Sequence, residues 1–216
     1  MKVGTDGVLI GSWANHVLPK DILDIGTGTG LIALMLAQRF PNANIVGVDV
    51  DQSACKDAQH NFNQSPFFTR MQLVKGRIQN YNPPNKFDLV VSNPPFFENS
   101  LKPSTQSRST ARHTGQLNFR ELINNACRLL NKNGVIAMII PKSREFDLIS
   151  ITEQEGLFLE AITEVRGTSF TPVKRVLVAF SRKPGELTKS TLVVENSRHQ
   201  YTNEYIQLTK DFYLKM

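Results

Sequence analysis

The sequence has few cysteines and no long apolar run, and each shortage excludes a class of protein. Cys55 and Cys127 are the only cysteines, so no disulfide framework is implied and both thiols are expected to be reduced and structural. No apolar run approaches the roughly 20 residues that span a bilayer. The opening residues, MKVGTDGVLIGSW, lack the charged and then apolar plan of a signal peptide. We therefore expect a cytoplasmic protein without a membrane segment.

What is present is the composition of a folded globular protein, with 40% apolar and 20% charged residues in 216. This length predicts one domain, residues 1–216, and we expect it to act as a monomer. The formal net charge of +6 favours polyanionic partners, nucleic acid first, although many basic proteins bind none.

Short β-type runs alternate with helical patterns along the chain. Strands are predicted at 21–25, 44–50, 71–76, 86–93 and 134–141, and helices at 29–40, 52–64, 118–134 and 143–156. Two further strands, 157–167 and 174–182, have no helix between them and therefore indicate a hairpin. The predicted fold is α/β: a doubly wound, mostly parallel, seven-stranded sheet with one antiparallel edge hairpin strand.

Ligands of such sheets bind beyond the carboxyl ends of the strands. The loops that follow the first four predicted strands hold Gly26 to Gly30, Asp49, Arg77 and Asn93. These loops are therefore the expected site.

The first of these loops belongs to the stretch DIGTGTG, residues 24–30, between a strand and a helix. Glycines allow φ > 0 and let a ligand touch the backbone. Asp49 ends the next strand, where a carboxylate can accept both hydroxyls of a ribose. The spacing is G-x-G-x-G and not the G-x-G-x-x-G of dinucleotide sites, and Asp24 suits a cationic ligand better than a pyrophosphate.

The fourth loop begins with NPPF, residues 93–96. Asn-Pro and Pro-Pro are also plain turn signals. The side-chain oxygen of Asn93 and the carbonyl of Pro94 can accept the two N–H groups of an exocyclic amine and aim its lone pair at an electrophile. Phe96 can stack on the face of a base. No general base is strictly required for this chemistry.

DIGTGTG, VGVDVD and GRI together resemble the S-adenosylmethionine-dependent methyltransferases of the seven-stranded class, which have a Rossmann-like methyltransferase fold. The resemblance implies that the glycine loop passes beneath the methionine part, that Asp24 lies near its ammonium, and that Asp49 holds the ribose. The remaining residues that it implies for the cofactor are Gly26, Gly28 and Gly30 in the loop, and Arg77 and Ile78 beside the adenine. Many family members carry Asp where Arg77 stands.

NPPF resembles the [NDS]-P-P-[YFW] motif of enzymes that methylate adenine N6, guanine N2, cytosine N4 or glutamine N5. The stretches 2–14, 93–97, 111–114 and 204–216 narrow this resemblance to the bacterial tRNA(Val) adenine-37 N6-methyltransferase family. That family implies methyl transfer to an adenine of tRNA, with Lys2, Gly4, Thr5, Asp6 and Asn93 lining the cofactor pocket. Its members usually have a few dozen residues before the KVGTDG stretch.

A long polar loop, residues 98–118, follows the NPPF turn. It is interpreted either as a tRNA contact or as a solvated loop. The predicted substrate contacts are Pro95, Phe96, Phe97, Arg108, Arg112 and His113, and Lys102 lies in the same loop. A basic rim of Lys142, Arg144, Lys174 and Arg175 is a further candidate, and a solvated surface is the alternative.

Three alternative functions stay open at this point: a glutamine-N5 methyltransferase of release factors, a guanine-N2 ribosomal RNA methyltransferase, and a catalytically inactive RNA-binding module. The first predicts a separate recognition domain before the catalytic one. No metal is expected in any of them. Tyr201, Tyr205, Leu208 and Phe212 recur at helical spacing, which predicts a C-terminal amphipathic helix, and Trp13 is expected in the core.

Overall fold

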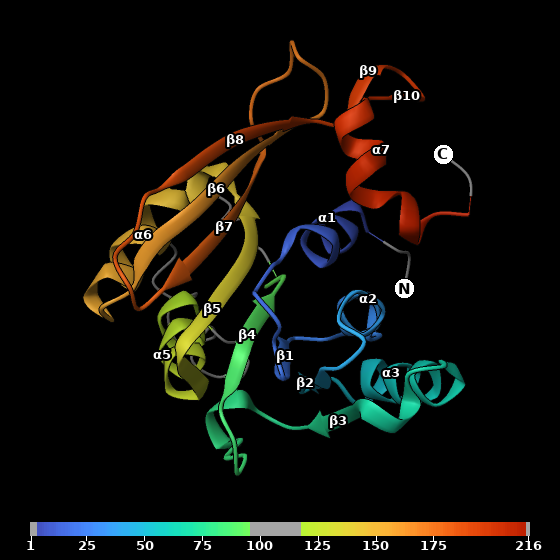
Figure 1. Cartoon of the computed structure of the whole chain (residues 1–216), viewed down its shortest axis with the longest axis vertical. Helices are drawn as coiled ribbons and strands as arrows, with labels where there is room; N and C mark the ends of the chain where they lie inside the picture. Colours follow the sequence, from blue (N-terminus) through green and yellow to red (C-terminus); the bar gives the residue numbers. More distant parts are fainter. Residues whose placement is uncertain (1–3, 96–117, 215–216) are drawn as a thin grey trace, which may run out of the picture.

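The computed structural model describes residues 4–95 and 118–214. Within these residues one eight-stranded sheet has the strand order β3-β2-β1-β4-β5-β7-β6-β8 (Figure 1). Its strands are β1 (Asp21–Ile25), β2 (Asn44–Asp49), β3 (Met71–Lys75), β4 (Phe87–Ser92), β5 (Leu130–Pro141), β6 (Phe158–Arg166), β7 (Arg175–Ser181) and β8 (Thr188–Val193). A two-stranded ribbon is formed by β9 (Glu195–Ser197) and β10 (Gln200–Tyr201).

The α-helices of the described residues are α1 (Thr5–Trp13), α2 (Leu31–Arg39), α3 (Gln52–Gln64), α5 (Phe119–Leu129), α6 (Glu145–Gln154) and α7 (Asn203–Thr209). The described residues also form four short 3₁₀ helices: η1 (Phe68–Arg70), η2 (Ile78–Asn80), η3 (Lys142–Arg144) and η4 (Lys210–Phe212). None of the helices in the described part of the chain is long and apolar enough to cross a membrane.

The predicted doubly wound, mostly parallel α/β sheet is confirmed, but the position of its antiparallel strand differs from the prediction. β7 runs antiparallel to both neighbours and lies between β5 and β6, so it is not at the edge. An eighth strand, β8, pairs in parallel with β6 and forms that edge. All six residues from Val176 to Ser181 are buried, which an inner strand requires. The short, polar sequence of β8 carries no such apolar signal.

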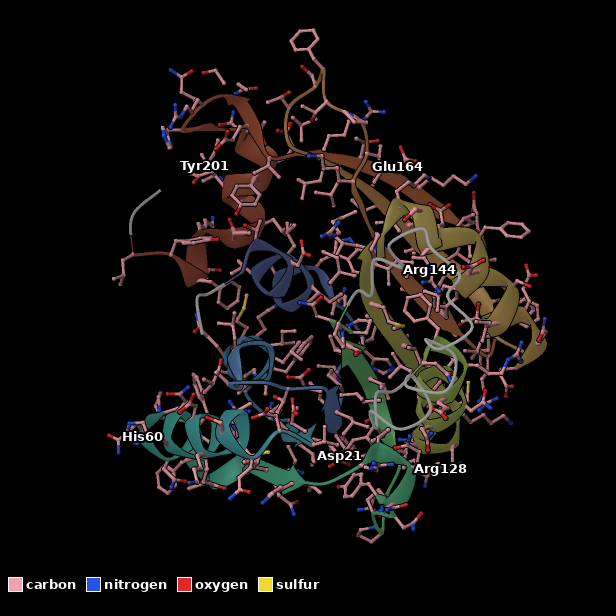
Figure 2. The ribbon with its side chains drawn as sticks, turned by 180° about the vertical axis from the view of Figure 1, so that it is seen from behind. Asp21, His60, Arg128, Arg144, Glu164 and Tyr201 are labelled. Atoms are coloured by element: carbon pink, nitrogen blue, oxygen red, sulfur yellow. The ribbon has the colours of Figure 1, made fainter. Side chains whose placement is uncertain are left out.

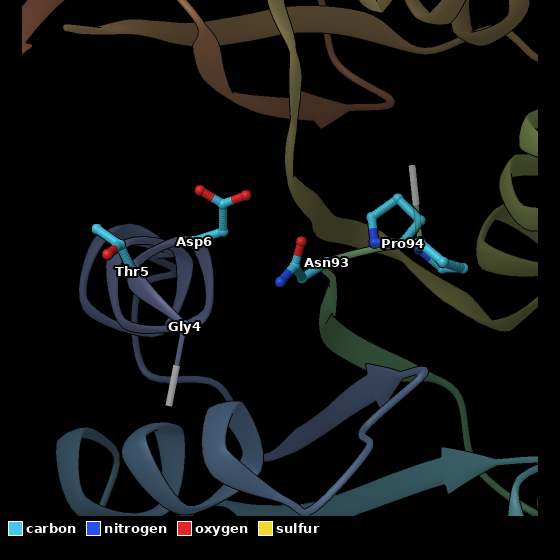
Figure 3. A pocket seen from close by; sticks show the side chains of 6 residues that line it. Gly4, Thr5, Asp6, Asn93 and Pro94 are labelled. Carbon is cyan, nitrogen blue, oxygen red and sulfur yellow. The ribbon is translucent and has the colours of Figure 1, made fainter. Parts of the chain in front are cut away.

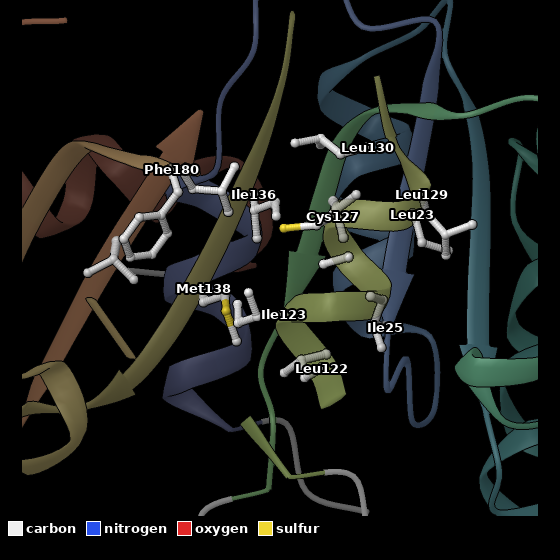
Figure 4. Packing of buried hydrophobic residues seen from close by; sticks show 14 of the residues in the cluster. Leu23, Ile25, Leu122, Ile123, Cys127, Leu129, Leu130, Ile136, Met138 and Phe180 are labelled. Carbon is white, nitrogen blue, oxygen red and sulfur yellow. The ribbon is translucent and has the colours of Figure 1, made fainter. Parts of the chain in front are cut away.

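Apolar side chains on the two faces of the sheet form two separate cores. Along β5, Ile136, Met138 and Ile140 join one cluster with α5 and α6. Ala137 and Ile139 alternate with them and join the other cluster, with α1, α2, α3 and α7. The period of two along a strand places successive side chains on opposite faces. Figure 1 shows the two sets of helices on opposite sides of the sheet, and Figure 4 shows the first core around α5 and β5.

The prediction of a helix over residues 118–134 was wrong at the C-terminal end of the helix, because Gly134 lies inside strand β5. The helix stops at Leu129 and the strand begins at Leu130 without an intervening loop. The register between β4 and β5 shifts there, from Phe87 opposite Leu130 to Leu89 opposite Val135. A Cβ atom at Gly134 would lie 2.7 Å from Leu130 Cδ1 and 3.0 Å from the Phe87 carbonyl oxygen. The glycine therefore permits a bulge in the sheet and does not cap the helix.

The C-terminal helix is shorter than its pattern predicted. It begins after Thr202, whose hydroxyl accepts a hydrogen bond from the Tyr205 amide at 3.2 Å. Tyr205 is buried as expected, whereas Tyr201 lies before the helix in β10 and is 37% exposed. Trp13 is partly buried against the second core and donates a hydrogen bond to Thr163.

Candidate active site

The carboxyl ends of β1 to β4 lie side by side, as the sequence predicted. Ile25 pairs with Val48 on one side and with Ser92 on the other, and Asp49 pairs with Lys75. The loops after these strands therefore start from one edge of the sheet. Figure 2 shows Arg144, just after the end of β5, well above Asp21, at the start of β1.

The glycine loop after β1 folds back over the end of β2. Gly26, Gly28 and Gly30 have φ of 75°, 57° and 85°, in the left-handed region. The amides of Gly26 and Thr27 donate to the Val48 carbonyl at 2.8 and 3.1 Å. These bonds fix the loop against the neighbouring strand.

Gly26 and Gly30 are required for different reasons. A Cβ atom at Gly30 would lie 2.5 Å from Phe62 Cε1, so the side chain of α3 packs directly on this glycine. A Cβ atom at Gly26 would meet no described atom within 4 Å, and the residue is exposed. Gly30 thus serves the packing of the fold, whereas Gly26 leaves open space above the loop.

Asp24 lies beneath the loop and is fully buried. Its Oδ2 accepts a hydrogen bond of 2.6 Å from the Thr27 hydroxyl, and Oδ1 has no hydrogen-bond partner among the described residues. Burial raises the pKa of Asp24 to about 7, against the opposing effect of the Thr27 hydrogen bond. No sequence pattern indicated the role of Thr27, whose hydroxyl donates to one of the two carboxylate oxygens.

Asp49 ends β2 and contacts the glycine loop. Its Oδ2 accepts from the Gly28 amide at 2.8 Å, and its Oδ1 accepts from the Asp51 amide at 2.9 Å. An ionised carboxylate has about four acceptor positions, so two remain for other donors. The Asp49 carbonyl accepts from the Gly76 amide at 2.8 Å, which brings the loop after β3 alongside.

The two predicted adenine contacts begin the turn that follows Gly76. Arg77 is exposed and stands at the start of η2, whereas Ile78 is buried and packs in the first core. The side chain of Ile78 therefore has a packing role in addition to any ligand contact.

Asn93 and the two prolines line an open cavity of about 470 Å³ together with Gly4, Thr5 and Asp6 (Figure 3). The Ser92 hydroxyl donates to the Ile25 carbonyl at 2.8 Å and is buried, which ties the end of β4 to the end of β1. Pro94 is buried, Asn93 is partly exposed and Pro95 is exposed. The NPP turn thus starts from a strand end that is fixed to the strand bearing the glycine loop.

The opposite wall of the cavity is helix α1, which the sequence did not reveal as a helix. Two of its glycines let it approach α2 closely: a Cβ atom at Gly11 would lie 2.7 Å from Met35 Sδ, and one at Gly7 would lie 3.2 Å from Leu31 Cδ2. Arg39 of α2 donates to the carbonyls of Gly11 and Ala14 at 2.8 and 2.6 Å. These bonds satisfy carbonyl groups that the end of a helix leaves without partners.

Asp6 of α1 forms an ion pair with Arg175 of β7, with 2.8 Å between Oδ2 and Nε. Both side chains are about one third exposed, at 28% and 34%. No sequence signal could have linked two residues 169 positions apart.

The predicted basic rim is only partly a free cationic surface. Lys142 lies 2.7 Å from carboxylate oxygens of both Glu145 and Glu164, and Arg144 pairs with Asp147 at 3.1 Å. Arg175 is held by Asp6. Ion pairs therefore offset the charge of three of the four predicted cations.

Several predicted site residues lie outside the described part of the chain. They are Lys2, Phe96, Phe97, Lys102, Arg108, Arg112 and His113. Within residues 4–95 and 118–214, no three His, Cys, Asp or Glu side chains are grouped as metal ligands.

The model of the methyltransferase small domain family matches residues 4–155 of this chain. A tRNA1(Val) (adenine(37)-N6)-methyltransferase of Flavobacterium psychrophilum is 43% identical over 220 residues, covering 100% of this chain and 94% of the relative. Enzymes of the same name from Parabacteroides distasonis and Vibrio cholerae are 44% and 41% identical, again over 100% of this chain and over 92% and 90% of theirs. The chain belongs to the tRNA1(Val) (adenine(37)-N6)-methyltransferase family.

Solved structures agree with this family at the level of the fold. A predicted O-methyltransferase from Agrobacterium tumefaciens superposes with a TM-score of 0.73 at 20% identity, covering 95% of this chain and 96% of that one. The glycopeptide N-methyltransferase MtfA complexed with S-adenosylmethionine gives 0.61 at 11% identity, covering 82% and 95%. The chain is an S-adenosylmethionine-dependent methyltransferase with the Rossmann-like methyltransferase fold.

The residues at the loop fit the cofactor of this family. The unpartnered Oδ1 of Asp24 is an acceptor next to a loop that a cation can approach. The open space above Gly26 admits a ligand against the backbone, and Asp49 keeps acceptor capacity at the end of β2. An acceptor-rich loop suits an ammonium and a sulfonium better than a pyrophosphate.

Proposed function

We propose that the chain transfers a methyl group from S-adenosylmethionine to the exocyclic N6 amine of an adenine in tRNA, at position 37 of tRNA(Val). The observation that carries this proposal is the place of Asn93 and Pro94. They follow the strand that pairs with β1, whose own carboxyl end opens the glycine loop. The relatives named above, which match the whole chain, bear the name of this reaction.

On this proposal Asn93 and Pro94 hold the amine. The side-chain oxygen of Asn93 accepts one N–H group, and the carbonyl of Pro94 accepts the other. Delocalisation into the ring makes such an amine a poor nucleophile, and two acceptors orient its lone pair away from the ring plane. Positioning of this kind supplies most of the rate enhancement.

The cofactor residues keep the roles that the sequence predicted. S-adenosylmethionine supplies an electrophilic methyl group when bound. Asp49 accepts hydrogen bonds from the ribose hydroxyls, and Asp24 lies near the methionine end. The other residues proposed for the pocket are Lys2, Gly4, Thr5, Gly26, Gly28, Gly30, Arg77 and Ile78.

The substrate side of the proposal involves residues beyond the NPP turn. Phe96 stacks on the target base, and Pro95 and Phe97 flank it. Arg108, Arg112 and His113 contact the RNA. We further propose that residues 1–216 act as one domain, as a monomer in the cytoplasm.

In the experiment that tests this proposal, the protein is incubated with tritiated S-adenosylmethionine and with total tRNA, a release factor or ribosomal RNA. The products are then digested, and the modified product is identified by mass. Label recovered as N6-methyladenosine from tRNA supports the proposal. Label in glutamine or in N2-methylguanosine would establish one of the alternatives. Cofactor binding without label in any substrate would contradict methyl transfer to all three.

A further inference from the structure

Among the lining side chains that belong to the described residues, Asp6 is the one acidic side chain. The others belong to Gly4, Thr5, Asn93, Pro94 and Pro95, which are neutral. The family resemblance implies only that Asp6 lines the cofactor pocket, and the reaction as derived above, where two neutral acceptors hold the amine, gives its carboxylate no part. Its presence therefore calls for a chemical reason.

The Asp6 carboxylate lines the same cavity as Asn93. Asp6 projects from the first turn of α1, and Asn93 projects from the end of β4 toward the same space (Figure 3). The glycine loop follows β1, which lies beside β4. Asp6 and Asn93 thus approach a ligand of this cavity from two opposite walls, α1 and the NPP turn.

Two features favour a carboxylate at this position of α1. The first turn of a helix favours negatively charged side chains, and Asp6 is the acidic residue of that turn. Arg175 donates from Nε to Oδ2 of Asp6 at 2.8 Å. Arg175 is itself anchored, because it pairs with Pro141 of β5 and donates from Nη1 to the Lys174 carbonyl at 3.2 Å. The ion pair therefore holds the carboxylate.

Methyl transfer creates a positive charge where Asp6 can act on it. The N–C bond forms as the S–C bond breaks, so the charge of the sulfonium passes to the amine nitrogen, which still carries two protons. One proton must then leave to give the neutral N-methyl product. A fixed carboxylate stabilises charge that develops in the transition state.

We propose that Asp6 is a catalytic residue of the methyl transfer, which stabilises the cationic amine nitrogen and accepts its proton, and that Arg175 is its positioning residue. This rests on the proposed function, because the charge arises only when an amine is the acceptor. The proton passes from nitrogen to an oxygen of Asp6 and then to solvent.

The test separates chemistry from binding with Asp6→Asn, which keeps the shape of the side chain and removes its charge. Single-turnover methylation of tRNA at saturating enzyme is expected to slow by about 10²-fold. Dissociation constants for S-adenosylmethionine, by titration calorimetry, and for tRNA, by filter binding, are expected to stay within about threefold. Asp147→Asn is the matched control, since Asp147 is also ion-paired at this edge, with Arg144.

The role of Arg175 is tested by measuring the same single-turnover rate of tRNA methylation. Arg175→Gln is expected to slow the single turnover less than Asp6→Asn does, and Arg175→Lys is expected to recover part of the loss. In the double variant Asp6→Asn with Arg175→Gln, the rate should equal that of Asp6→Asn alone, because Arg175 acts through Asp6. If the rate losses of the two single variants multiply in the double variant, Arg175 does not act by positioning Asp6.

Other outcomes overturn the role of Asp6. A weaker cofactor affinity with an unchanged rate at saturation would make Asp6 a cofactor ligand only. An unchanged rate and unchanged affinities would remove it from the reaction. A wild-type chain that methylates no tRNA would overturn the proposed function as well, whereas an active wild type with an unaffected Asp6→Asn would overturn this inference alone.

Discussion

The glycine loop, named here the cofactor wall, and helix α1, which lines the cavity opposite the NPP turn, are held in different ways. The cofactor wall is held by residues close in the chain: Thr27 bonds Asp24 three positions away, and Gly28 bonds Asp49. The opposite wall, α1, is held by Arg39 of α2 and by Arg175 of β7, which lies 169 positions from Asp6. The cofactor wall is thus held by local contacts, whereas α1 is held by contacts with distant parts of the chain. Substitutions on the two sides should therefore change different steps.

The largest effect is expected on the NPP turn. Asn93→Ala removes one of the two acceptors of the amine, and we expect kcat to fall by about 10²–10³-fold. Affinity for S-adenosylmethionine should change little, as measured by titration calorimetry. Activity that survives within a few-fold would contradict the proposed role of Asn93.

On the cofactor wall the expected effect is on binding. Asp49→Ala removes the carboxylate that we propose for the ribose, and we expect the dissociation constant of S-adenosylmethionine to rise by roughly 10–100-fold. The single-turnover rate at saturating cofactor should change far less. Asp49→Asn, which keeps acceptor capacity on one oxygen, is the graded control. Equal losses in rate and affinity would show that the two walls are not separable in this way.

Gly26 and Gly30 provide a matched pair within one loop. An alanine at either position costs about 1–2 kcal/mol because φ is positive. Gly30→Ala also meets Phe62 and should lose roughly 1–3 kcal/mol more in urea unfolding. Gly26→Ala should instead lose cofactor affinity, since its Cβ enters the open space above the loop. Similar unfolding free energies for the two variants would exclude the proposed clash.

The smallest effect concerns pH. Burial raises the pKa of Asp24 to about 7 from 3.8, so the folded protein holds a proton that the unfolded chain has released. The contribution of Asp24 to stability should therefore be full below its unfolded pKa of 3.8 and be lost as the pH rises to about 7, with no further loss above it. Between pH 5 and 8 the wild type should lose on the order of 2 kcal/mol more than Asp24→Asn. Parallel pH profiles of the two unfolding free energies would contradict this.

The sequence predicted the parts of the site that local patterns encode. Strand-helix alternation placed Gly26, Asp49 and Asn93 at one edge, and the structure confirms that placement. The prediction failed at Gly134, because a glycine after a helical run can either cap the helix or permit a bulge, and the sequence is the same in both cases. Only the register between β4 and β5 distinguishes the two cases.

The contacts of the site between residues far apart in the chain could not be predicted from the sequence. The pattern of α1 carries no clear apolar stripe, since its residues are buried on nearly every side between α2 and the sheet. The pairing of Asp6 with Arg175 depends on β7 being inserted between β5 and β6, which no local spacing encodes. The roles of the residues at the site remain predictions that the variants above test.

The ion pair between Asp6 and Arg175 also orders events in time during synthesis. Helix α1 and the glycine loop leave the ribosome well before β7, which emerges only after most of the sheet has been made. Contacts between residues so far apart form late, because their loop must close before they contribute. A nascent chain can thus complete the cofactor wall early, whereas the cavity for the acceptor is finished only when the last inner strand is in place.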